Sequence, residues 1–372
     1  MLTHKVITKY DEFLKLKQAW NELVTNSEAH HVFVKHEWLA EFIRAYNLQD
    51  LLSIVVTWVD GQLAAIAPIQ RKRFFFRRIP ADGLTFLASD LGLRVGFIVS
   101  DAALVQGLVN RLLQLKDWDV FLAANIYSES DTTRRFLEMM DSSKYSYQIA
   151  RGFHSPYLTT EGSWEDYWNH LPSKRRNYLK NMCLRRLQQA DSYEIDQITT
   201  PEAFKAYAPN MFDVSRRSWK VDSDDYFTFD SPQGQLYLNF TPFGLEHNLV
   251  AIYTLRINNK LIGFEYLLKC DTKHLVLRCD YDREYSYYSP GNNLRIAIVK
   301  DLFSRPESCE YDMGGDDDLY KLQWCGKVRR HVTITIGNRN IKGSMVMFAK
   351  NTMLPFLRKV KGGVKNTRDA ER

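Results

Sequence analysis

The sequence lacks the features that mark secreted, disulfide-built and membrane-spanning proteins. Its five cysteines are scattered, odd in number and form no Cys-x-x-Cys pair, which favours free thiols in a reducing compartment over a disulfide framework or a zinc site. No run of about 18 apolar residues predicts a membrane-spanning helix. The first residues also contain no apolar stretch typical of a secretory signal. We therefore expect a cytoplasmic protein.

A strong excess of one charge is missing as well. The chain has 50 basic and 44 acidic residues, a net charge of +6 over 372 residues. This excess is too small to indicate nucleic-acid binding by itself, and we expect no DNA partner, but it suits an anionic cofactor or substrate. The sequence also has no Gly-x-Ser-x-Gly, Walker or His-Glu-x-x-His motif. The hydrophobic fraction of 45% argues against wholesale disorder.

Two similar stretches of sequence predict a duplicated α/β unit. Each contains two β-rich runs around a two-residue polar turn, Asp60-Gly61 in the first and Asn258-Asn259 in the second, which is typical of a β-hairpin. Helix-period patterns precede both hairpins. The sequence thus predicts a mixed α/β fold with two lobes and a C-terminal helix with a frayed basic tail. The predicted divisions are 1–155, 156–345 and 346–372.

The segment from Cys279 to Lys321 is the richest in residues that carry chemistry. Its pattern predicts a strand, a Gly/Pro turn, a helix, a second strand and an acidic loop. Pro290 suits the first position of a helix, and Gly291 beside it lets a ligand approach the backbone. Because the first N–H groups of a helix have no intrahelical partner and lie at the positive end of its dipole, we expect an anion site there.

Carboxylates and a Tyr-Lys pair flank this helix start. Asp282 precedes the turn, Asp312 ends the second strand, and Tyr320-Lys321 follows three successive aspartates. Carboxylates at strand ends beside a helix start suit acid–base chemistry. The alternative is a solvated acidic loop that caps the next helix. Three consecutive side chains do not converge easily on one ion, so we expect no metal.

Three basic segments have two interpretations each. Ser173 to Arg186, inside a helix predicted over Trp164 to Gln189, has six basic residues and no acid. It is either a solvated helix or a contact for an anionic substrate, a glycolipid headgroup or tRNA. Arg71 to Arg78 is typical of a hairpin end whose phenylalanines turn inward, with membrane-surface contact as the alternative. Met345 to Lys359 predicts a helix that packs on the second lobe or touches a membrane.

Taken together, these motifs resemble one family. The runs YDREYSYYSPGNNLRIAIV and YDMGGDDDLYKLQW, with the upstream Arg-rich helix and the SRRSWK element, are similar to the acetyltransferase-like family of polysaccharide and cellulose biosynthesis clusters. This family, often labelled CelD-type, belongs to the GNAT superfamily of N-acyltransferases. The sequence departs from it at Arg283, where the family usually has Pro, and at Asp316, where its loop normally has Gly.

The resemblance implies two tandem GNAT-like lobes, each a mixed twisted sheet flanked by helices. The first lobe is degenerate because it has no Ser-Pro-Gly or Tyr-Lys counterpart, and the second is catalytic. The expected co-substrate is acetyl-CoA or another acyl-CoA, with its pantetheine paired along the strand His274 to Asp280. The expected residues for its pyrophosphate lie at the helix start: Ser289, Gly291, Asn292 and Asn293.

The resemblance also suggests catalytic roles. Asp282 or Asp312 is the expected base, and Tyr320 is the expected proton donor. Lys321 would steady a substrate anion or the oxyanion. The expected substrate contacts are Arg175, Arg176 and Trp219.

Three functions remain open at this point. The first is an acyltransferase acting on a sugar nucleotide, a lipid-linked sugar or a similar envelope precursor. The second is a Fem-type aminoacyl transferase, which shares the two-lobe arrangement and uses aminoacyl-tRNA. The absence of a long helical-hairpin insertion counts against it. The third is a non-catalytic subunit of a polysaccharide-assembly complex.

Overall fold

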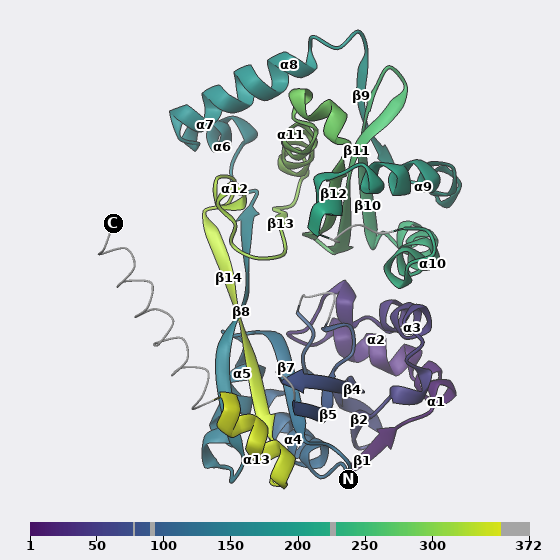
Figure 1. The fold of residues 1–372 in the computed structure, drawn as a ribbon, viewed down its shortest axis with the longest axis vertical. Coiled ribbons are helices and arrows are strands. Elements are labelled where there is room, and N and C mark those ends of the chain that lie inside the picture. The colour runs from purple at the N-terminus through teal and green to yellow at the C-terminus, as the bar shows by residue number, and fades with distance from the viewer. Residues whose placement is uncertain (77–78, 90–93, 224–227, 351–372) are drawn as a thin grey trace. The chain divides into compact units, whose positions relative to one another are not determined.

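The computed structural model describes residues 1–76, 79–89, 94–223 and 228–350 (Figure 1). The chain divides into two compact units. The first comprises residues 1–39, 47–153 and those from 330 onward, and the second comprises residues 40–46 and 154–329. Each unit is a mixed sheet structure with helices, so the predicted α/β fold is confirmed. The lobe boundaries predicted at 155 and 345 stay predictions.

The first unit contains two groups of paired strands. Its strands are β1 (Leu2–Ile7), β2 (Ile54–Val59), β3 (Gln62–Ala67), β4 (Ile69–Phe76), β5 (Ile79–Phe86), β6 (Ile98–Val99), β7 (Val120–Tyr127), the first part of β8 (Ser146–Thr159) and most of β14 (Lys327–Gly337). Its helices are α1 (Tyr10–Leu14), α2 (Lys17–Thr25), η1 (Val32–Val34), η2 (Gln49–Leu51), η4 (Ala102–Leu104), α4 (Val105–Leu113), α5 (Asp131–Ser142) and α13 (Ile341–Phe348), together with the start of α3 (His36–Ala45), whose residues from 40 onward belong to the second unit. The strand orders are β1-β2-β3-β6 and β4-β5-β7-β14, with β5 and β7 parallel.

The second unit is built on one mixed sheet. Its strands are the end of β8 (Ser146–Thr159), β9 (Tyr193–Ile198), β10 (Val250–Ile257), β11 (Lys260–Cys270), β12 (Lys273–Tyr281) and β13 (Glu310–Asp312). Its helices are α6 (Trp164–His170), α7 (Ser173–Tyr178), η5 (Leu179–Leu184), α8 (Arg185–Leu187), α9 (Pro201–Arg216), η6 (Trp219–Ser223), α10 (Pro232–Glu246), η7 (Arg283–Tyr288), α11 (Pro290–Phe303) and α12 (Leu319–Leu322). The strand order is β8-β13-β12-β11-β10-β9, and only the pair β12 and β13 is parallel among these described strands.

Both predicted hairpins form. Asp60 and Gly61 join β2 to β3 with φ angles of 49° and 84°, and Asn258 and Asn259 join β10 to β11 with φ angles of 51° and 62°. Two successive residues with positive φ match the turn that continues the right-handed twist of the strands. Asn, Asp and Gly tolerate this conformation best, which is why the signal was readable from sequence.

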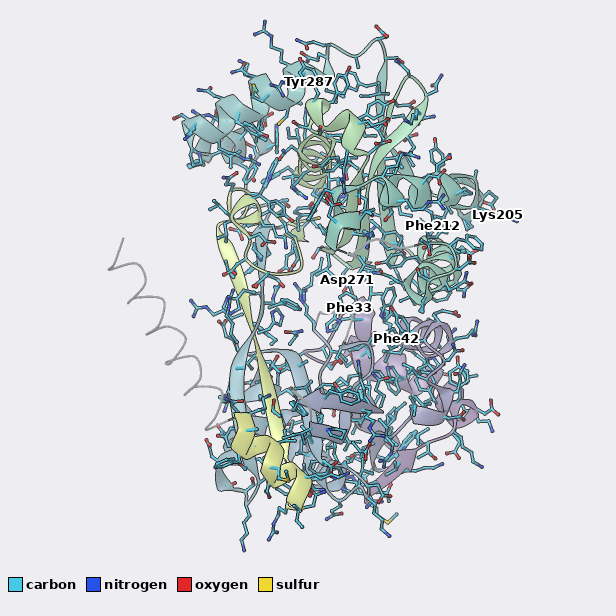
Figure 2. The ribbon with its side chains drawn as sticks, in the orientation of Figure 1. Phe33, Phe42, Lys205, Phe212, Asp271 and Tyr287 are labelled. Carbon is cyan, nitrogen blue, oxygen red and sulfur yellow. The ribbon has the colours of Figure 1, made fainter. Side chains whose placement is uncertain are left out.

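Helices cover both faces of the second unit's sheet (Figure 1). β11 is buried along nearly its whole length, as expected for a central strand with both faces covered. On one face α11 buries Leu294 and Ile298 against the sheet. On the other face Phe212 of α9, labelled in Figure 2, joins Tyr237 of α10 against Tyr266 of β11. Alternate residues of β11 therefore face different helices.

Some predicted elements differ in detail. The helix predicted over Trp164 to Gln189 ends at His170, restarts after Pro172 and widens into the π-helix η5, because Pro172 cannot continue the first helix. Of the phenylalanines expected to turn inward, Phe76 packs beside Val346, whereas Phe75 is 71% exposed because alternate strand residues point to opposite faces. α13 covers only the start of the helix predicted over Met345 to Lys359; residues 351–359 lie outside the described residues.

Candidate active site

The start of α11 keeps only part of the predicted anion site. Pro290 is its first residue, and no side chain among the described residues caps it. Ser289 precedes it with φ 51° and ψ 53°, a left-handed conformation that is sparsely populated for residues other than glycine. The amides of Asn292 and Asn293 both donate to the Ser289 carbonyl at 3.1 Å. The Gly291 amide lies at the positive end of the dipole.

The basic segment packs directly against this helix start. Arg175 of α7 donates from Nη2 to Asn292 Oδ1 at 3.1 Å, and Ser289 Oγ donates to the Met182 carbonyl at 3.3 Å. Further along, the Arg186 guanidinium lies 4.6 Å from the ring centre of Tyr287, which Figure 2 labels beside α8. The structure therefore brings a predicted substrate contact, Arg175, to a predicted donor-binding residue, Asn292.

A widened helical turn gives the basic segment its register on α11. In η5, Leu179 and Cys183 are buried, and the Cys183 carbonyl accepts a hydrogen bond from Asn293 Nδ2 at 3.3 Å. π-turns occur mostly as short bulges within helices and are frequent at functional sites. Here the bulge lies between Arg175, which contacts Asn292 of α11, and Arg186, which contacts Tyr287 of η7.

Two buried polar atoms at this contact have no hydrogen-bond partner within the described residues, Arg175 Nε and Asn293 Oδ1. The Arg175 guanidinium also lies 5.0 Å from the ring centre of Trp324 and 5.4 Å from that of Tyr178. Burial lowers the pKa of Arg175, but an arginine remains charged at neutral pH. An unsatisfied buried donor costs about 1–3 kcal/mol. A cation with a spare donor beside a helix start fits a diphosphate group.

The parallel strands β12 and β13 pair over a short length only. Lys273–Leu275 pairs with Glu310–Asp312, and β12 then continues to Tyr281 with no described β13 partner. The pairing of β11 with β12 also changes register between Tyr266 and Leu267, which is typical of a β-bulge. Unpaired strand backbone of this kind can hydrogen-bond an extended ligand. The pantetheine strand predicted over His274 to Asp280 lies here.

Tyr320 and Lys321 lie on the short helix α12 but have different surroundings. Tyr320 is 50% exposed, and desolvation raises its pKa to about 12. Lys321 is buried, and its Nζ donates to the carbonyls of Gly314 at 2.9 Å and Asp316 at 3.0 Å. Its Nζ also lies 3.2 Å from Asp318 Oδ2. Lys321 thus ties the acidic loop to α12, while Tyr320 is the member of the pair that a substrate can reach.

The two expected bases are buried in ion pairs. Asp282 Oδ2 lies 2.7 Å from Arg217 Nε and 3.6 Å from Lys260 Nζ. Asp312 Oδ2 lies 2.6 Å from Arg329 Nη1. Each carboxylate is therefore already engaged by at least one cation. Their assignment as bases stays a prediction.

The other expected substrate contacts lie elsewhere in the second unit. The Arg176 side chain donates to the Asn169 carbonyl at the end of α6. Trp219 begins η6 and is 49% exposed. Neither has a hydrogen bond or ring contact to the start of α11 within the described part of the chain. Their role in substrate binding stays a prediction.

Sequence reasoning missed a buried polar cluster next to Tyr320. Glu265 of β11, Arg295 of α11 and Tyr311 of β13 are joined by hydrogen bonds. Each is at most 6% exposed. The Arg295 guanidinium lies 5.9 Å from the ring centres of both Tyr320 and Trp324. The sequence did contain a signal, because each of two otherwise apolar runs holds one charged residue: Glu265 in LIGFEYLL and Arg295 in LRIAIV.

A groove of about 360 Å³ opens beside α12, a volume within the usual range for ligand sites. Three aromatic side chains, Tyr157, Tyr167 and Trp324, contribute to its lining, and no carboxylate lines it. Lys327 is the lysine among its lining residues. Its lining residues are Tyr157, Leu158, Thr159, Tyr167, His170, Leu171, Pro172, Leu322, Gln323, Trp324, Cys325, Gly326 and Lys327.

Comparison with protein families identifies the class of this site. Residues 173–322 match the family described as "Acetyltransferase (GNAT) domain", and all the predicted site residues lie within that range. Residues 173–322 are therefore a GNAT-type acetyltransferase domain, and the prediction that the protein is an acyltransferase is confirmed. The narrower CelD-type assignment stays a prediction. No curated protein matches the chain.

Solved structures show the same fold over nearly the whole chain. FemX matches with a TM-score of 0.57 and 11% identity, covering 89% of this chain and 96% of its own. A conserved protein of unknown function from Bacteroides thetaiotaomicron VPI-5482 has a TM-score of 0.56 and 13% identity, covering 91% and 100%. L-PGS from Bacillus licheniformis has a TM-score of 0.55 and 11% identity, covering 92% and 95%. The predicted tandem GNAT-like arrangement is confirmed.

Proposed function

We propose that the protein transfers an acyl group, most simply acetyl, from acyl-CoA to a sugar of an envelope or polysaccharide precursor. The observation that carries the donor assignment is the contact of Arg175 with Asn292 at the start of α11. A cation with an unsatisfied donor, a helix dipole and nearby unpaired strand backbone together suit a diphosphate with an extended tail.

The proposed chemistry uses Tyr320 as the proton donor. The acceptor nitrogen or oxygen attacks the thioester carbonyl carbon, the carbon–sulfur bond breaks, and the departing sulfur takes the phenol proton. Desolvation raises the pKa of Tyr320 to about 12, so the proton is in place at neutral pH. Asp282 and Asp312 remain the proposed bases, and Lys321 holds the loop that leads into α12.

A second donor, aminoacyl-tRNA, is the alternative. The exposed basic residues of the helical segment over Ser173–Leu187 favour it, because cations on one short segment suit a phosphate backbone. Lys174, Lys180 and Arg185 are all exposed. A non-catalytic role in a polysaccharide-assembly complex is the third possibility.

A binding experiment on the full chain separates these donors. Acetyl-CoA is expected to raise the melting temperature, because a ligand that binds the native state stabilises it. Arg175→Ala should weaken binding about tenfold or more, the loss expected for a charged hydrogen bond. Lys174→Ala, an exposed lysine on the same helix, is the matched control. The measurement is a thermal-shift titration with acetyl-CoA, longer acyl-CoAs and uncharged tRNA.

The other outcomes of this titration are equally informative. Stabilisation by tRNA that falls steeply with salt and is lost in Lys174→Glu/Lys180→Glu would contradict the acyl-CoA proposal and support the tRNA donor. The absence of stabilisation by any of these ligands would instead support the non-catalytic role.

The groove beside α12 is the proposed acceptor site. Aromatic rings suit the apolar faces of a sugar, and Lys327, whose Nζ lies 3.6 Å from the exposed Glu161, offers a cation to an attached phosphate. Lys327→Glu is expected to raise the acceptor KM roughly tenfold, the effect of losing one charged hydrogen bond. The donor KM should not change. Steady-state kinetics with a sugar acceptor measures both KM values. Lys273→Glu, at an exposed lysine outside the groove, is the control. An equal rise in both KM values would contradict the assignment.

Location and membrane contact are also proposals. Among the described residues, no helix has the length and apolar character needed to cross a membrane. The five cysteines are free thiols, which supports a reducing compartment such as the cytoplasm. α13 exposes Ile341, Met345 and Phe348 along one face, which supports contact with the membrane that would carry a lipid-linked acceptor.

A further inference from the structure

Three elements of the second unit contribute to one buried polar cluster. Tyr311 OH donates to Glu265 Oε1 and accepts from Arg295 Nε at 3.3 Å, and Arg295 Nη2 lies 3.4 Å from Glu265 Oε2. Glu265 and Tyr311 are fully buried, and Arg295 is 6% exposed. The three side chains therefore satisfy one another in a closed hydrogen-bonded ring.

Fold stability does not explain why this cluster is present. Removing an ion pair from water costs several kcal/mol per ion, and an apolar set of similar volume is often as stable or more stable. The neighbours of Arg295 on α11, Leu294 and Ile296, are apolar and buried. Buried charges that are held in this way beside an open site are often functional.

Tyr320, the proposed proton donor, is a partly exposed side chain that faces this cluster. Its half-exposed ring has a centre 5.9 Å from the Arg295 guanidinium. Trp324 is 2% exposed, and its ring centre lies at the same distance from Arg295. The other charged or titratable groups that face Tyr320 are Lys321, with Nζ 5.7 Å from its ring centre, Asp318, Cys279 of β12 and Glu265.

We propose that Arg295, held by Glu265 and Tyr311, is a positioning residue that stabilises the phenolate left on Tyr320 after proton donation. This inference rests on the proposed acyl transfer. In that step a bond forms between the acceptor atom and the carbonyl carbon, and the carbon–sulfur bond breaks with its electron pair going to sulfur. Sulfur takes the Tyr320 proton. The proton lost by the acceptor restores the phenol through solvent, so the protein is unchanged overall.

The charges of the cluster have opposite effects on the Tyr320 phenol. A cation favours the phenolate and lowers the pKa of Tyr320, whereas a carboxylate raises it. Burial alone would lower the pKa of Arg295, but Tyr311 and Glu265 beside it raise that pKa overall. The guanidinium therefore stays charged while Tyr320 gives up its proton.

The test measures the Tyr320 phenol directly in the full chain without substrate. Tyrosines are replaced by 3,5-difluorotyrosine, whose more acidic phenol titrates at a lower pH, and fluorine NMR follows each ring. Tyr320→Phe assigns the signal. Arg295→Gln is expected to raise the Tyr320 pKa by about one unit, and Glu265→Gln to lower it by a similar amount. Arg295→Lys, which keeps the charge, should restore part of the shift.

These opposite shifts distinguish a positioning role from a purely structural one, which would not move the pKa in two directions. Glu265→Gln keeps the volume and the hydrogen-bond acceptor, so the test survives if Arg295→Gln does not fold. An unchanged Tyr320 titration in Glu265→Gln and in Arg295→Gln would overturn the inference, and Glu265→Gln alone decides if Arg295→Gln does not fold. Acyl-CoA stabilisation of the same variants tests the proposed function separately, so the two can fail independently.

Kinetics gives a second readout. Arg295→Lys is expected to lower kcat about tenfold with the donor KM unchanged, because the cation acts after the donor has bound. In a Tyr320→Phe background the same substitution should have little further effect, because there is no phenolate to stabilise. An equal loss in both backgrounds would contradict the link to Tyr320.

Discussion

Replacing Tyr320 by phenylalanine is expected to lower kcat by about 10²–10³-fold, the usual contribution of a positioned proton donor. The donor KM and the stabilisation by acyl-CoA should be unchanged. The ring contacts of Tyr320 with Arg295 and Lys321 involve its face, and phenylalanine retains them. The loss would therefore come from the hydroxyl group alone. Steady-state kinetics of acyl-CoA consumption measures it.

Tyr193 provides the matched control for this experiment. It lies on β9 and is 45% exposed, close to the exposure of Tyr320. Tyr193→Phe is expected to leave kcat unchanged. Full activity of Tyr320→Phe would remove the proton-donor role, and a collapse of acyl-CoA binding would show that the hydroxyl serves binding and not chemistry.

Replacing Asp312 by alanine is expected to lower the free energy of unfolding by about 3 kcal/mol, because breaking a buried pair leaves its partner charge uncompensated. Asp312 is 1% exposed and lies 2.6 Å from Arg329. The remaining pair of Arg329 with Glu310, at 2.7 Å, keeps the loss at the lower end of the usual range. Denaturant unfolding monitored by circular dichroism measures the change.

A second substitution shows how much of this loss comes from the ion pair. Arg329→Met in the Asp312→Ala background should recover part of the stability, because the unpaired cation is removed. Glu161→Ala is the control, since Glu161 is 73% exposed and its pair with Lys327 spans 3.6 Å; its effect should stay within about 0.5 kcal/mol. A loss of turnover in Asp312→Asn without a loss of stability would instead favour the proposed role as a base.

Local signals made much of the second unit predictable. The helix start at Pro290 and the hairpin turn at Asn258-Asn259 are specified by residues with restricted or unusual backbone preferences, so each can be read within a few positions. The end of the strand at Asp312 was readable for the same reason, because Gly314 and Gly315 follow it with φ angles of 58° and 59°.

Long-range pairing made the rest unreadable. Arg175 and Asn292 are 117 positions apart, and Glu265 and Tyr311 are 46 apart. Their contacts depend on how helices and strands pack, which one sequence does not specify. Lys321 shows the same limit. Its position beside Tyr320 suggested a catalytic group, which stays a prediction, but its contacts with the loop carbonyls could not be read from the sequence.

The π-helix η5 means that the length of the basic segment matters as well as its composition. Each residue of an α-helix advances the direction of its side chain by about 100° and the chain by about 1.5 Å. A relative lacking one residue within Leu179–Leu184 would keep the same charges and nearly the same helix length. Arg175 and Arg186 would then keep their contacts with Asn292 and Tyr287 only if the deletion falls inside the π-turn, which can close into a regular α-helical turn, so alignments of this segment should place a single-residue gap within Leu179–Leu184.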